Sequence, residues 1–392
     1  MNVLMLAPEP FFQPRGTPIS VYFRIQALSE LNHRVDLITY PLGEDVENPN
    51  LEVHRIPNLL GLKRIKIGPS FIKLPLDFLM FWKAFSRLAG RRYDLIFSHE
   101  EAAFLGVILG KIWKVPHLYD MHSSLPQQLE NFDFSRSRLL KKAFTRMERF
   151  ILKHSQAVIV ICQDLRETVK REGFESKAVL IENFLDFPGP AYSEDKIRAK
   201  RKELAPGGEK IVLYAGNFQP YQGIALLLEA AAKVGEKARF LFVGGSPTEN
   251  EEMGEKAEAL GIRKKVVFVD RVAPSQVPLY ISLADVLVSP RLSGTNTPLK
   301  IYSFLKSGKP VVATRLWTHT QILDDKISVL VEPDPEHMAR GISFALFNED
   351  ARRRAETARF LAEKEYTPER YLEKIRACLE IARSNFKTGK SL

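Results

Sequence analysis

Short apolar runs alternate along the chain with longer segments of helical periodicity. In the first half, the runs predict strands at Asn2–Ala7, Arg34–Tyr40, Asp94–Ser98, His117–Tyr119 and Ala157–Ile161. In the second half, they predict strands at Lys210–Ala215, Ala238–Val243, Val266–Val269, Asp285–Val288, Pro310–Ala313 and Ser328–Val331. The intervening helices include Ile19–Leu31, Ala102–Trp113, a long helix ending near His154 and a last helix at Pro368–Ser384. Such alternation favours parallel sheets with right-handed crossover helices.

The alternation stops around Phe187–Pro190 and resumes at Lys210, after a charged segment that we interpret as a linker. The chain has 392 residues, too many for one ordinary core, so we predict an α/β protein with two doubly wound parallel-sheet domains. We place the first at residues 1–187, completed by a C-terminal helix within 368–392, and the second at 188–367. Ligands of such sheets bind beyond the carboxyl ends of the strands, so we expect a substrate cleft between two facing domains.

Several classes of protein are disfavoured by composition. The chain has no run of about 18 uncharged apolar residues, and its first residues lack the basic region of a signal peptide. We therefore expect a cytoplasmic protein. The two cysteines, Cys162 and Cys378, have no metal-ligand spacing and are expected to fill the core. The eight histidines are scattered and no Asp-x-Asp occurs, so we predict neither a metal site nor a cofactor.

The net charge of +10 would suit nucleic acid, an anionic membrane or simply a charged surface. No recognition helix or zinc spacing supports nucleic acid, which we do not expect as a partner. Between Lys63 and Arg92, basic residues interleave with aromatic ones, as in a segment lying on an anionic bilayer. The alternative is a helix at about Leu76–Leu88 that faces the core and has a basic outer side.

The segment from Ser289 to Thr314 predicts a strand, a loop, a helix from about Pro298 to Ser307, a turn and a strand. Thr297 is a plausible N-cap, and proline suits the first turn of a helix. Free N–H groups at a helix N-terminus, together with Lys300 in the first turn, suit a diphosphate. The alternative is an ordinary well-capped helix.

Three further loops follow predicted strands and carry glycines or polar side chains that permit close approach of a phosphate or a sugar. They are Arg15–Pro18, Gly216–Gly223 and Gly244–Ser246. A glycine after a strand is usually only a turn. Four such loops at the same edges of two sheets favour a ligand site.

Taken together, these blocks resemble the retaining glycosyltransferases of family 4, which have the GT-B architecture of two facing Rossmann-like domains. The resemblance covers nearly the whole chain. Its motifs are Gly16, the segment DLIFSH at Asp94–His99, the histidine of YDMH at Tyr119–His122, IEN at Ile181–Asn183, the loop Gly216–Gly223, FVGG at Phe242–Gly245, and Ala284–Pro290 leading to Gly308–Val312. The resemblance implies transfer of a sugar from a nucleotide diphosphate donor to a lipid-linked or polysaccharide acceptor, with retention of configuration and without metal.

The resemblance also assigns candidate site residues. Those for the donor are Gly16, Thr17, Gly216, Asn217, Gln222, Gly245, Arg271, Val272, Arg291, Gly294, Thr295, Asn296, Thr297, Pro298, Leu299, Lys300 and Ser303. Among these, Arg271 and Val272 should border the base. His122 matches the family histidine near the transferred sugar and is the catalytic candidate. The alternative is a histidine that only holds its loop in place through Asp120. Arg15, Glu100 and Glu101 are candidates for the acceptor; the two glutamates would alternatively cap the helix beginning near Ala102.

Four residues depart from the family pattern. Two glutamates of the family correspond to Thr295 and Ser303, and an arginine and a lysine that meet the diphosphate correspond to Asn217 and Gln222. Neutral donors stabilise a departing diphosphate less than cations do. The alternative to an active enzyme is therefore a non-catalytic scaffold or nucleotide-binding protein of the same fold. An epimerase or a phosphorylase of similar architecture is a further alternative.

Overall fold

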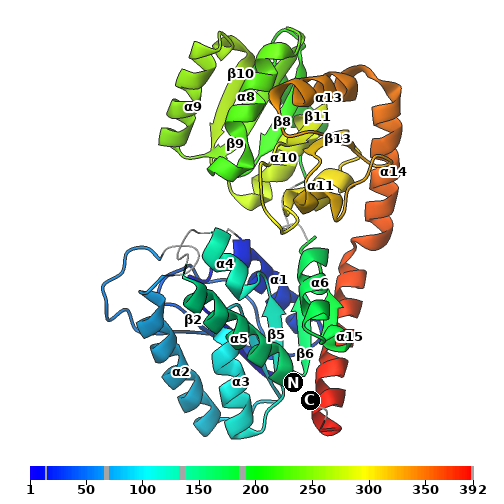
Figure 1. The fold of residues 1–392 in the computed structure, drawn as a ribbon. Coiled ribbons are helices and arrows are strands. Elements are labelled where there is room, and N and C mark those ends of the chain that lie inside the picture. Colours follow the sequence, from blue (N-terminus) through cyan, green and yellow to red (C-terminus); the bar gives the residue numbers. More distant parts are fainter. Residues whose placement is uncertain (14–15, 66–69, 132–136, 185–190, 390–392) are drawn as a thin grey trace. The chain divides into compact units, whose positions relative to one another are not determined.

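The computed structural model describes residues 1–13, 16–65, 70–131, 137–184 and 191–389. It forms two compact units, one of residues 1–183 with 368–392 and the other of residues 184–367. Each unit is a parallel sheet with helices on both faces (Figure 1). The predicted α/β class with two doubly wound sheets is confirmed. Among the described residues, no helix is both long and apolar enough to span a bilayer.

The sheet of unit 1 has the strand order β3-β2-β1-β4-β5-β6-β7. Its strands are β1 (Asn2–Ala7), β2 (Arg34–Thr39), β3 (Leu51–Arg55), β4 (Leu95–His99), β5 (His117–Met121), β6 (Ala157–Val160) and β7 (Ala178–Leu180). The five predicted strands are all present. The edge strands β3 and β7 were not predicted. Both are only partly buried; the apolar residues of β3 alternate with polar ones, and β7 is apolar but has only three residues.

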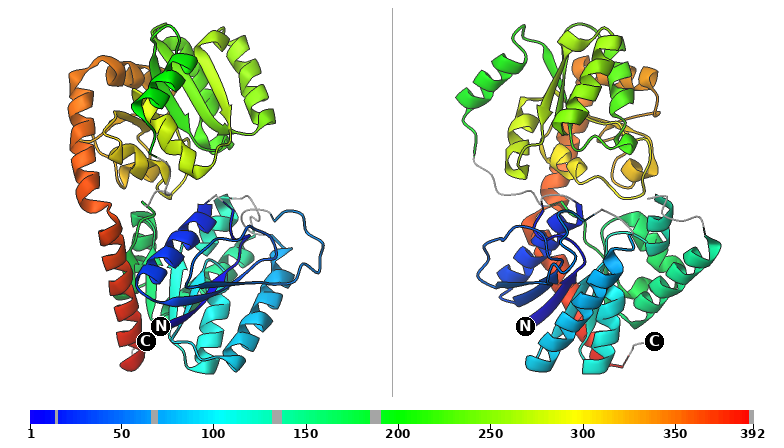
Figure 2. Two further views of the ribbon diagram at one scale, coloured as in Figure 1. Left: turned by 180° about the vertical axis from the view of Figure 1, so that it is seen from behind. Right: turned by 90° about the vertical axis from the view of Figure 1, so that its left-hand side faces the viewer.

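Helices cover both faces of this sheet. They are α1 (Gly16–Glu30), α2 (Lys73–Gly90), α3 (Ala102–Trp113), α4 (Leu125–Asn131), α5 (Arg138–His154), α6 (Gln163–Arg171) and α15 (Pro368–Lys387), with a 3-10 turn at Glu175–Lys177. Helix α3 packs between α2 and α5 on one face, whereas α1 and α15 pack together on the other (Figures 1 and 2). The C-terminal helix thus completes the unit formed by the N-terminal half.

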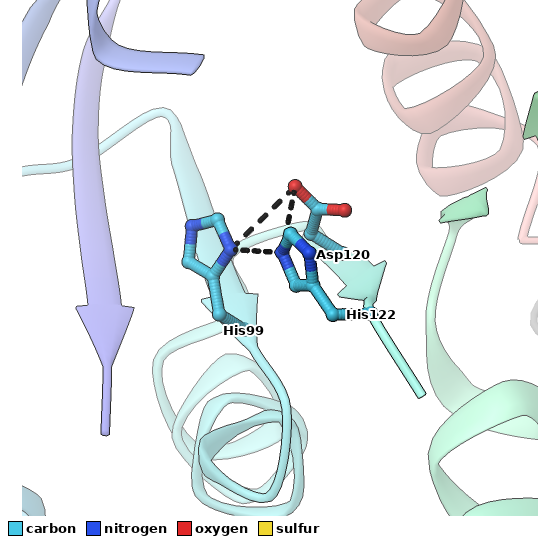
Figure 3. Close-up of side chains that lie close together, drawn as sticks. All are labelled: His99, Asp120 and His122. Carbon is cyan, nitrogen blue, oxygen red and sulfur yellow. Dashed lines mark hydrogen bonds and ion pairs between the residues drawn. The ribbon is translucent and has the colours of Figure 1, made fainter. Parts of the chain in front are cut away.

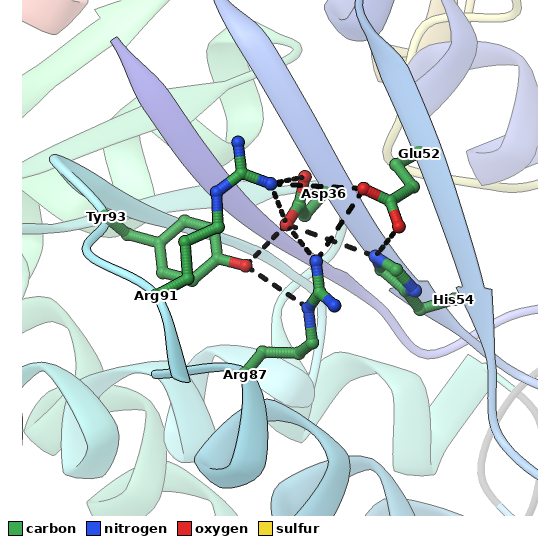
Figure 4. A network of polar contacts seen from close by, with 6 residues as sticks. All are labelled: Asp36, Glu52, His54, Arg87, Arg91 and Tyr93. Carbon is green, nitrogen blue, oxygen red and sulfur yellow. Dashed lines mark hydrogen bonds and ion pairs between the residues drawn. The ribbon is translucent and has the colours of Figure 1, made fainter. Parts of the chain in front are cut away.

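A polar network fixes α2 against the sheet (Figure 4). Asp36 on β2 is buried and accepts hydrogen bonds from Arg87 (2.7 Å), Arg91 (3.1 Å) and the hydroxyl of Tyr93 (2.5 Å). Burial would raise the pKa of this carboxyl group, but these three partners lower it below its ordinary value. Asp36 therefore stays ionised and holds the last turn of α2 in place.

The sheet of unit 2 has the order β10-β9-β8-β11-β12-β13. Its strands are β8 (Lys210–Ala215), β9 (Ala238–Gly245), β10 (Val266–Asp270), β11 (Val286–Ser289), β12 (Val311–Thr314) and β13 (Val329–Val331). All six were predicted within two residues. Alternate residues of β8 face different cores: Val212 and Tyr214 pack on one side, and Ile211 and Leu213 on the other.

Two groups of helices cover the faces of this sheet. They are α7 (Glu194–Leu204), α8 (Ile224–Lys233), α9 (Pro247–Ala259), α10 (Val277–Leu283), α11 (Lys300–Lys306), α12 (Trp317–Thr320), α13 (Pro335–Phe347) and α14 (Glu349–Glu365), with 3-10 turns at Pro220–Gln222, Arg263–Lys265 and Pro274–Gln276. Helix α7 lies in the charged segment that we interpreted as a linker, and for these residues the interpretation is wrong; Phe187–Pro190, where that segment begins, lie outside the described residues. Ser193 caps α7, Leu204 packs in the core, and Arg201 donates to Asp285 over 2.6 Å.

Candidate active site

In unit 2, the loops after β8, β9 and β11 come together because these strands are neighbours in a parallel sheet. Gly216, directly after β8, has a positive φ of 149°. A Cβ atom placed there would lie 2.9 Å from Nζ of Lys300 and 3.0 Å from the hydroxyl of Tyr214. Glycine is needed at this position because the backbone passes directly beside the two side chains.

Lys300 has a buried amine with no counter-ion among the described residues. Its Nζ has no hydrogen-bond partner in the described part of the chain and lies 3.9 Å from the centre of the Tyr214 ring. Burial lowers the pKa of Lys300 well below its ordinary value, and the charge of Arg291 lowers it further. A buried amine that lacks an anion to stabilise its protonated form indicates a place where an anionic ligand would supply the missing partner.

Arg291 belongs to the same site but is largely engaged by its own loop. Its Nη1 donates to the carbonyl of Asn296 (3.0 Å) and to the hydroxyl of Thr318 (2.9 Å), and its guanidinium lies 5.3 Å from the ring centre of Tyr221. Its buried Nε has no partner in the structure as described. Arg291 therefore holds the loop around Gly294 in place and keeps one donor for a ligand.

The helix that follows this loop starts later than we predicted. Helix α11 begins at Lys300 rather than Pro298, and its N-cap is Leu299, which makes no side-chain capping bond. The prediction that Thr297 is the N-cap is wrong. The carbonyl of Thr295 accepts a hydrogen bond from the side chain of Gln321, the C-cap residue of α12. This bond holds the backbone before α11 in a non-helical position. The hydroxyl of Thr297 is instead buried and unpartnered within the described structure.

The neutral residues at the departing positions differ from one another. Gln222 is buried, and its Oε1 has no partner among the described residues. Asn217 is exposed, and its Oδ1 accepts from the N–H of Gln219 within its own loop. Ser303 is half-buried on α11, one turn after Lys300. Of this group, Gln222 has the buried, unpartnered atom expected of a ligand contact.

The loop predicted to border the base, Arg271–Val272, follows β10 and is hydrogen-bonded to the end of β9. The N–H of Arg271 donates to the carbonyl of Gly245 over 3.0 Å, while the side chain of Arg271 is exposed. Val272 packs against the core and is not fully exposed. A Cβ atom on Gly245 would collide with Asn250 and Phe218, so this position requires glycine for packing reasons alone.

The remaining candidates lie in unit 1. Gly16 and Thr17 form the first turn of α1, and Arg15 lies outside the described residues. His122 directly follows β5 and is 4% exposed. Its Nε2 lies 3.1 Å from Nδ1 of His99 and 3.5 Å from Oδ2 of Asp120 (Figure 3).

Sequence analysis named Asp120 beside His122 but did not find His99 and Arg24 as members of the same group. Neighbouring strands place His99 beside Asp120 in register, and Nε of Arg24 donates to Oδ2 of Asp120 over 2.9 Å. The signals available were the histidine that ends DLIFSH and an arginine among the apolar residues of the first helix. Both are weak signals, because the pairing depends on strand register rather than on spacing in the sequence.

Two groups of residues in the described chain have metal-ligating atoms within 4.8 Å of one another: His99, Asp120 and His122, and Asp36, Glu52 and His54. Sequence spacing did not reveal either group, because each draws on two strands. In each group, the aspartate already accepts hydrogen bonds from arginine. A divalent cation would therefore meet fixed positive charge, which disfavours its binding.

Glu100 and Glu101 are engaged by different partners. Glu100 accepts from Ser123 (2.9 Å) and from Gln128 (2.8 Å), and burial raises its pKa to about 7. Glu101 accepts from Lys73 over 2.7 Å. Glu101 occupies the N-cap position of α3, yet its side chain makes no capping bond. The capping alternative is therefore not supported for Glu101.

Comparison with known proteins bears on the whole chain. The model of the family described as Glycosyltransferase Family 4 matches residues 14–187, and that of Glycosyl transferases group 1 matches residues 195–360. An uncharacterized glycosyltransferase of Methanocaldococcus jannaschii is 26% identical over 365 residues, which cover 88% of this chain and 89% of that protein.

Solved structures show the same fold at low identity. Sucrose-phosphate synthase from Thermosynechococcus elongatus has a TM-score of 0.76 at 21% identity, with 99% of both chains covered. The Anabaena protein HepE in complex with UDP has a TM-score of 0.71 at 18% identity, with both chains fully covered. With its two halves each matched by a glycosyltransferase family and its fold shared with such structures, this chain belongs to the family 4, group 1 glycosyltransferases of the GT-B fold.

Proposed function

We propose that the protein transfers a sugar from a nucleotide diphosphate sugar to a hydroxyl group of a lipid-linked or polysaccharide acceptor, with retention of the anomeric configuration. The observation that carries this proposal is Lys300, a buried amine that has no counter-ion beside Gly216. A diphosphate would supply the missing negative charge. The structural neighbour HepE was solved with UDP, so UDP-sugars are the first donors to test.

The proposed chemistry depends on stabilising the leaving group. Lys300, the free donor of Arg291 and the hydroxyl of Thr297 would bind the departing diphosphate, while His122 would contact the transferred sugar. Because these side chains supply the charge, we expect no metal requirement, and a chelator should leave transfer unchanged. Glu100 is the stronger candidate for an acceptor hydroxyl, since the carboxylate of Glu101 is already paired with Lys73.

The test is a screen of UDP-, GDP- and ADP-sugars by thermal shift and by release of nucleotide diphosphate. One donor should stabilise the protein and release its nucleotide when a lipid-linked or polysaccharide acceptor is added. The anomeric coupling constant of the product, measured by NMR, distinguishes retention from inversion. Binding of a donor without turnover on any acceptor would instead support the non-catalytic scaffold, which the neutral residues Thr295, Ser303, Asn217 and Gln222 suggest.

We also propose that unit 1 binds an anionic membrane surface. Helix α2 buries Leu76, Met80, Ala84 and Leu88, as the core-facing alternative predicts. Its outer side is aromatic rather than basic, however: Phe78 is 61% and Trp82 is 52% exposed, and they share a face with Leu74 at 64%. Exposed apolar side chains on one helix face suit insertion into the headgroup region.

We infer that a helix outside the segment Lys63–Arg92 adds positive charge to this contact. Within the segment Lys63–Arg92, Lys73, Arg87 and Arg91 pair with carboxylates and are not free for lipid. Helix α5, on the same face of the sheet, exposes a series of basic residues, and its only acidic residue, Glu148, is buried. These basic residues are Arg138, Lys141, Lys142 and Arg146.

Sedimentation with vesicles tests the membrane contact. Binding should require anionic lipid, weaken with salt and fall when Phe78 and Trp82 are both changed to serine. The control is Phe360→Ser, which changes a side chain that is 71% exposed on α14 in unit 2. Equal binding to neutral vesicles, or equal loss in the control, would contradict the proposal.

A further inference from the structure

Arg24 is a fully buried arginine, and each of its three side-chain nitrogens donates a hydrogen bond. Its Nε donates to Oδ2 of Asp120 (2.9 Å), its Nη2 donates to the carbonyl of Ile181 (3.1 Å), and its Nη1 donates to the hydroxyl of Tyr371. Burial would raise the pKa of Asp120, but the positive charge of Arg24, the largest opposing influence, helps to hold it well below its ordinary range. Asp120 is therefore a buried carboxylate that only accepts hydrogen bonds.

The two histidine rings meet at this carboxylate. Nδ1 of His99 and Nε2 of His122 each lie 3.5 Å from Oδ2 of Asp120 and 3.1 Å from one another (Figure 3). Burial lowers the pKa of His99 to about 3, so its ring is neutral and has a single N–H group. Its other nitrogen, Nε2, is buried and has no partner in the described chain.

These contacts determine where the protons lie. A proton on Nε2 of His99 would bury an N–H group that has no acceptor, which costs about 1–3 kcal/mol. A proton on Nδ1 instead faces the carboxylate and the other ring. Two ring nitrogens 3.1 Å apart need one donor and one acceptor, so Nε2 of His122 must then be the acceptor. A neutral His122 consequently has its proton on Nδ1.

We propose that His99 and Asp120, held in place by Arg24, are positioning residues that fix the orientation and the tautomer of His122, with its proton on Nδ1. His122 then acts as a hydrogen-bond donor from a fixed ring rather than as a base that accepts a proton at that nitrogen. The catalytic consequence rests on the proposed function, whereas the tautomer does not.

The tautomer can be measured without substrate. Ring nitrogen chemical shifts of 15N-histidine protein distinguish the two neutral tautomers, and comparison with His122→Gln assigns the signal among the eight histidines. Wild-type protein at neutral pH should show protonated Nδ1. His99→Phe removes the donor N–H, so the proton of His122 should move to Nε2, where Asp120 accepts it. A proton on Nε2 in the wild type, or no change in His99→Phe, would overturn the proposal.

Two further variants separate positioning from folding. Tyr371→Phe removes a partner of Arg24 but no contact of the two rings, so the tautomer should stay the same. Arg24→Met leaves Asp120 buried without its arginine counter-ion, so the proton of His122 should no longer be confined to Nδ1. If this variant fails to fold, His99→Phe remains the test.

Activity gives the second measurement. His99→Phe should lower sugar transfer at least about tenfold while the Kd for the nucleotide diphosphate stays within about twofold. A switched tautomer with unchanged transfer would refute the proposed role of His122 in catalysis while leaving the positioning network intact. An unchanged tautomer with lowered transfer would refute the network.

Discussion

Replacing Lys300 by methionine tests the donor site most directly. Methionine keeps the length of the side chain but removes the buried amine that lies beside Gly216 and over Tyr214. A charge-assisted hydrogen bond to a ligand contributes about 1.5–3 kcal/mol, which corresponds to roughly 10- to 150-fold in Kd. Lys300→Met should therefore weaken binding of the nucleotide diphosphate by that factor.

The same change should stabilise the protein without ligand. The pKa of Lys300 is lowered in the folded state, so the unfolded chain binds more protons between that pKa and the ordinary value of about 10.4. The amine therefore destabilises the fold in this interval, and increasingly so as the pH falls through it. Lys300→Met should raise the free energy of unfolding, because it removes an unpaired buried amine and takes no hydrogen-bond partner away from another group.

Calorimetry can also follow the proton. A diphosphate beside Lys300 raises the pKa of this amine, so wild-type protein should take up a proton on binding at a pH above the pKa of the free form. At about pH 8 the phosphates are already ionised, because their last pKa is near 6. Titrations in buffers with different heats of ionisation report the uptake. Lys300→Met should show none.

The matched control is Lys306→Met, at the other end of α11. Lys306 is the last residue of α11 and donates to the carbonyl of Phe184 over 2.8 Å, whereas Lys300 begins the helix. This variant should retain nucleotide affinity and lose some stability. If Lys300→Met binds the nucleotide diphosphate as tightly as the wild type, or if both variants lose affinity equally, the assignment of the diphosphate site is refuted.

Three other changes test separate parts of the molecule. His122→Ala should reduce sugar transfer at least about tenfold in a steady-state assay while calorimetry shows unchanged nucleotide affinity; parental turnover would reduce His122 to a loop anchor. Burial raises the pKa of Glu100 from 4.5 to about 7, so the free energy of unfolding should fall as pH rises through this interval. Glu100→Gln should flatten that fall in denaturant titrations, and an unchanged slope would contradict the shift. Gly216→Ala should displace Lys300 and weaken nucleotide binding, whereas Gly235→Ala, where a Cβ atom meets nothing within 4 Å, should not.

The predictability of the strands follows from their burial. Central strands such as β8 are covered by helices on both faces. They therefore appear in the sequence as short, continuous apolar runs, the pattern typical of a buried parallel strand. The edge strand β3 alternates with polar residues and was missed. Helix α7 was taken for a linker because its stability depends on a cap, charge pairs and a single buried leucine, Leu204, rather than on an apolar stripe.

The site residues were predictable only where the chain brings them close in sequence. Lys300 was found because its loop and helix are contiguous, but its burial against Tyr214 depends on packing between β8 and α11. His122 was found from its place at a strand end. Its partners His99 and Arg24 come from another strand and from α1, and no spacing in the sequence encodes the register that joins them.

The loss of charged residues at Asn217 and Gln222 does not by itself imply loss of activity. A cation on an exposed loop is screened by water, whereas Lys300 is buried between Tyr214 and Gly216. At equal distance, a charge pair at an effective dielectric constant of about 20 interacts roughly four times as strongly as one in water at about 80. One buried lysine that is already in place can therefore replace much of the attraction of a cation at the exposed position of Asn217. The unpaired atoms of Gln222 and Thr297 beside the same loops support this conclusion, because a protein that had ceased to bind a ligand would gain stability by replacing them with apolar groups.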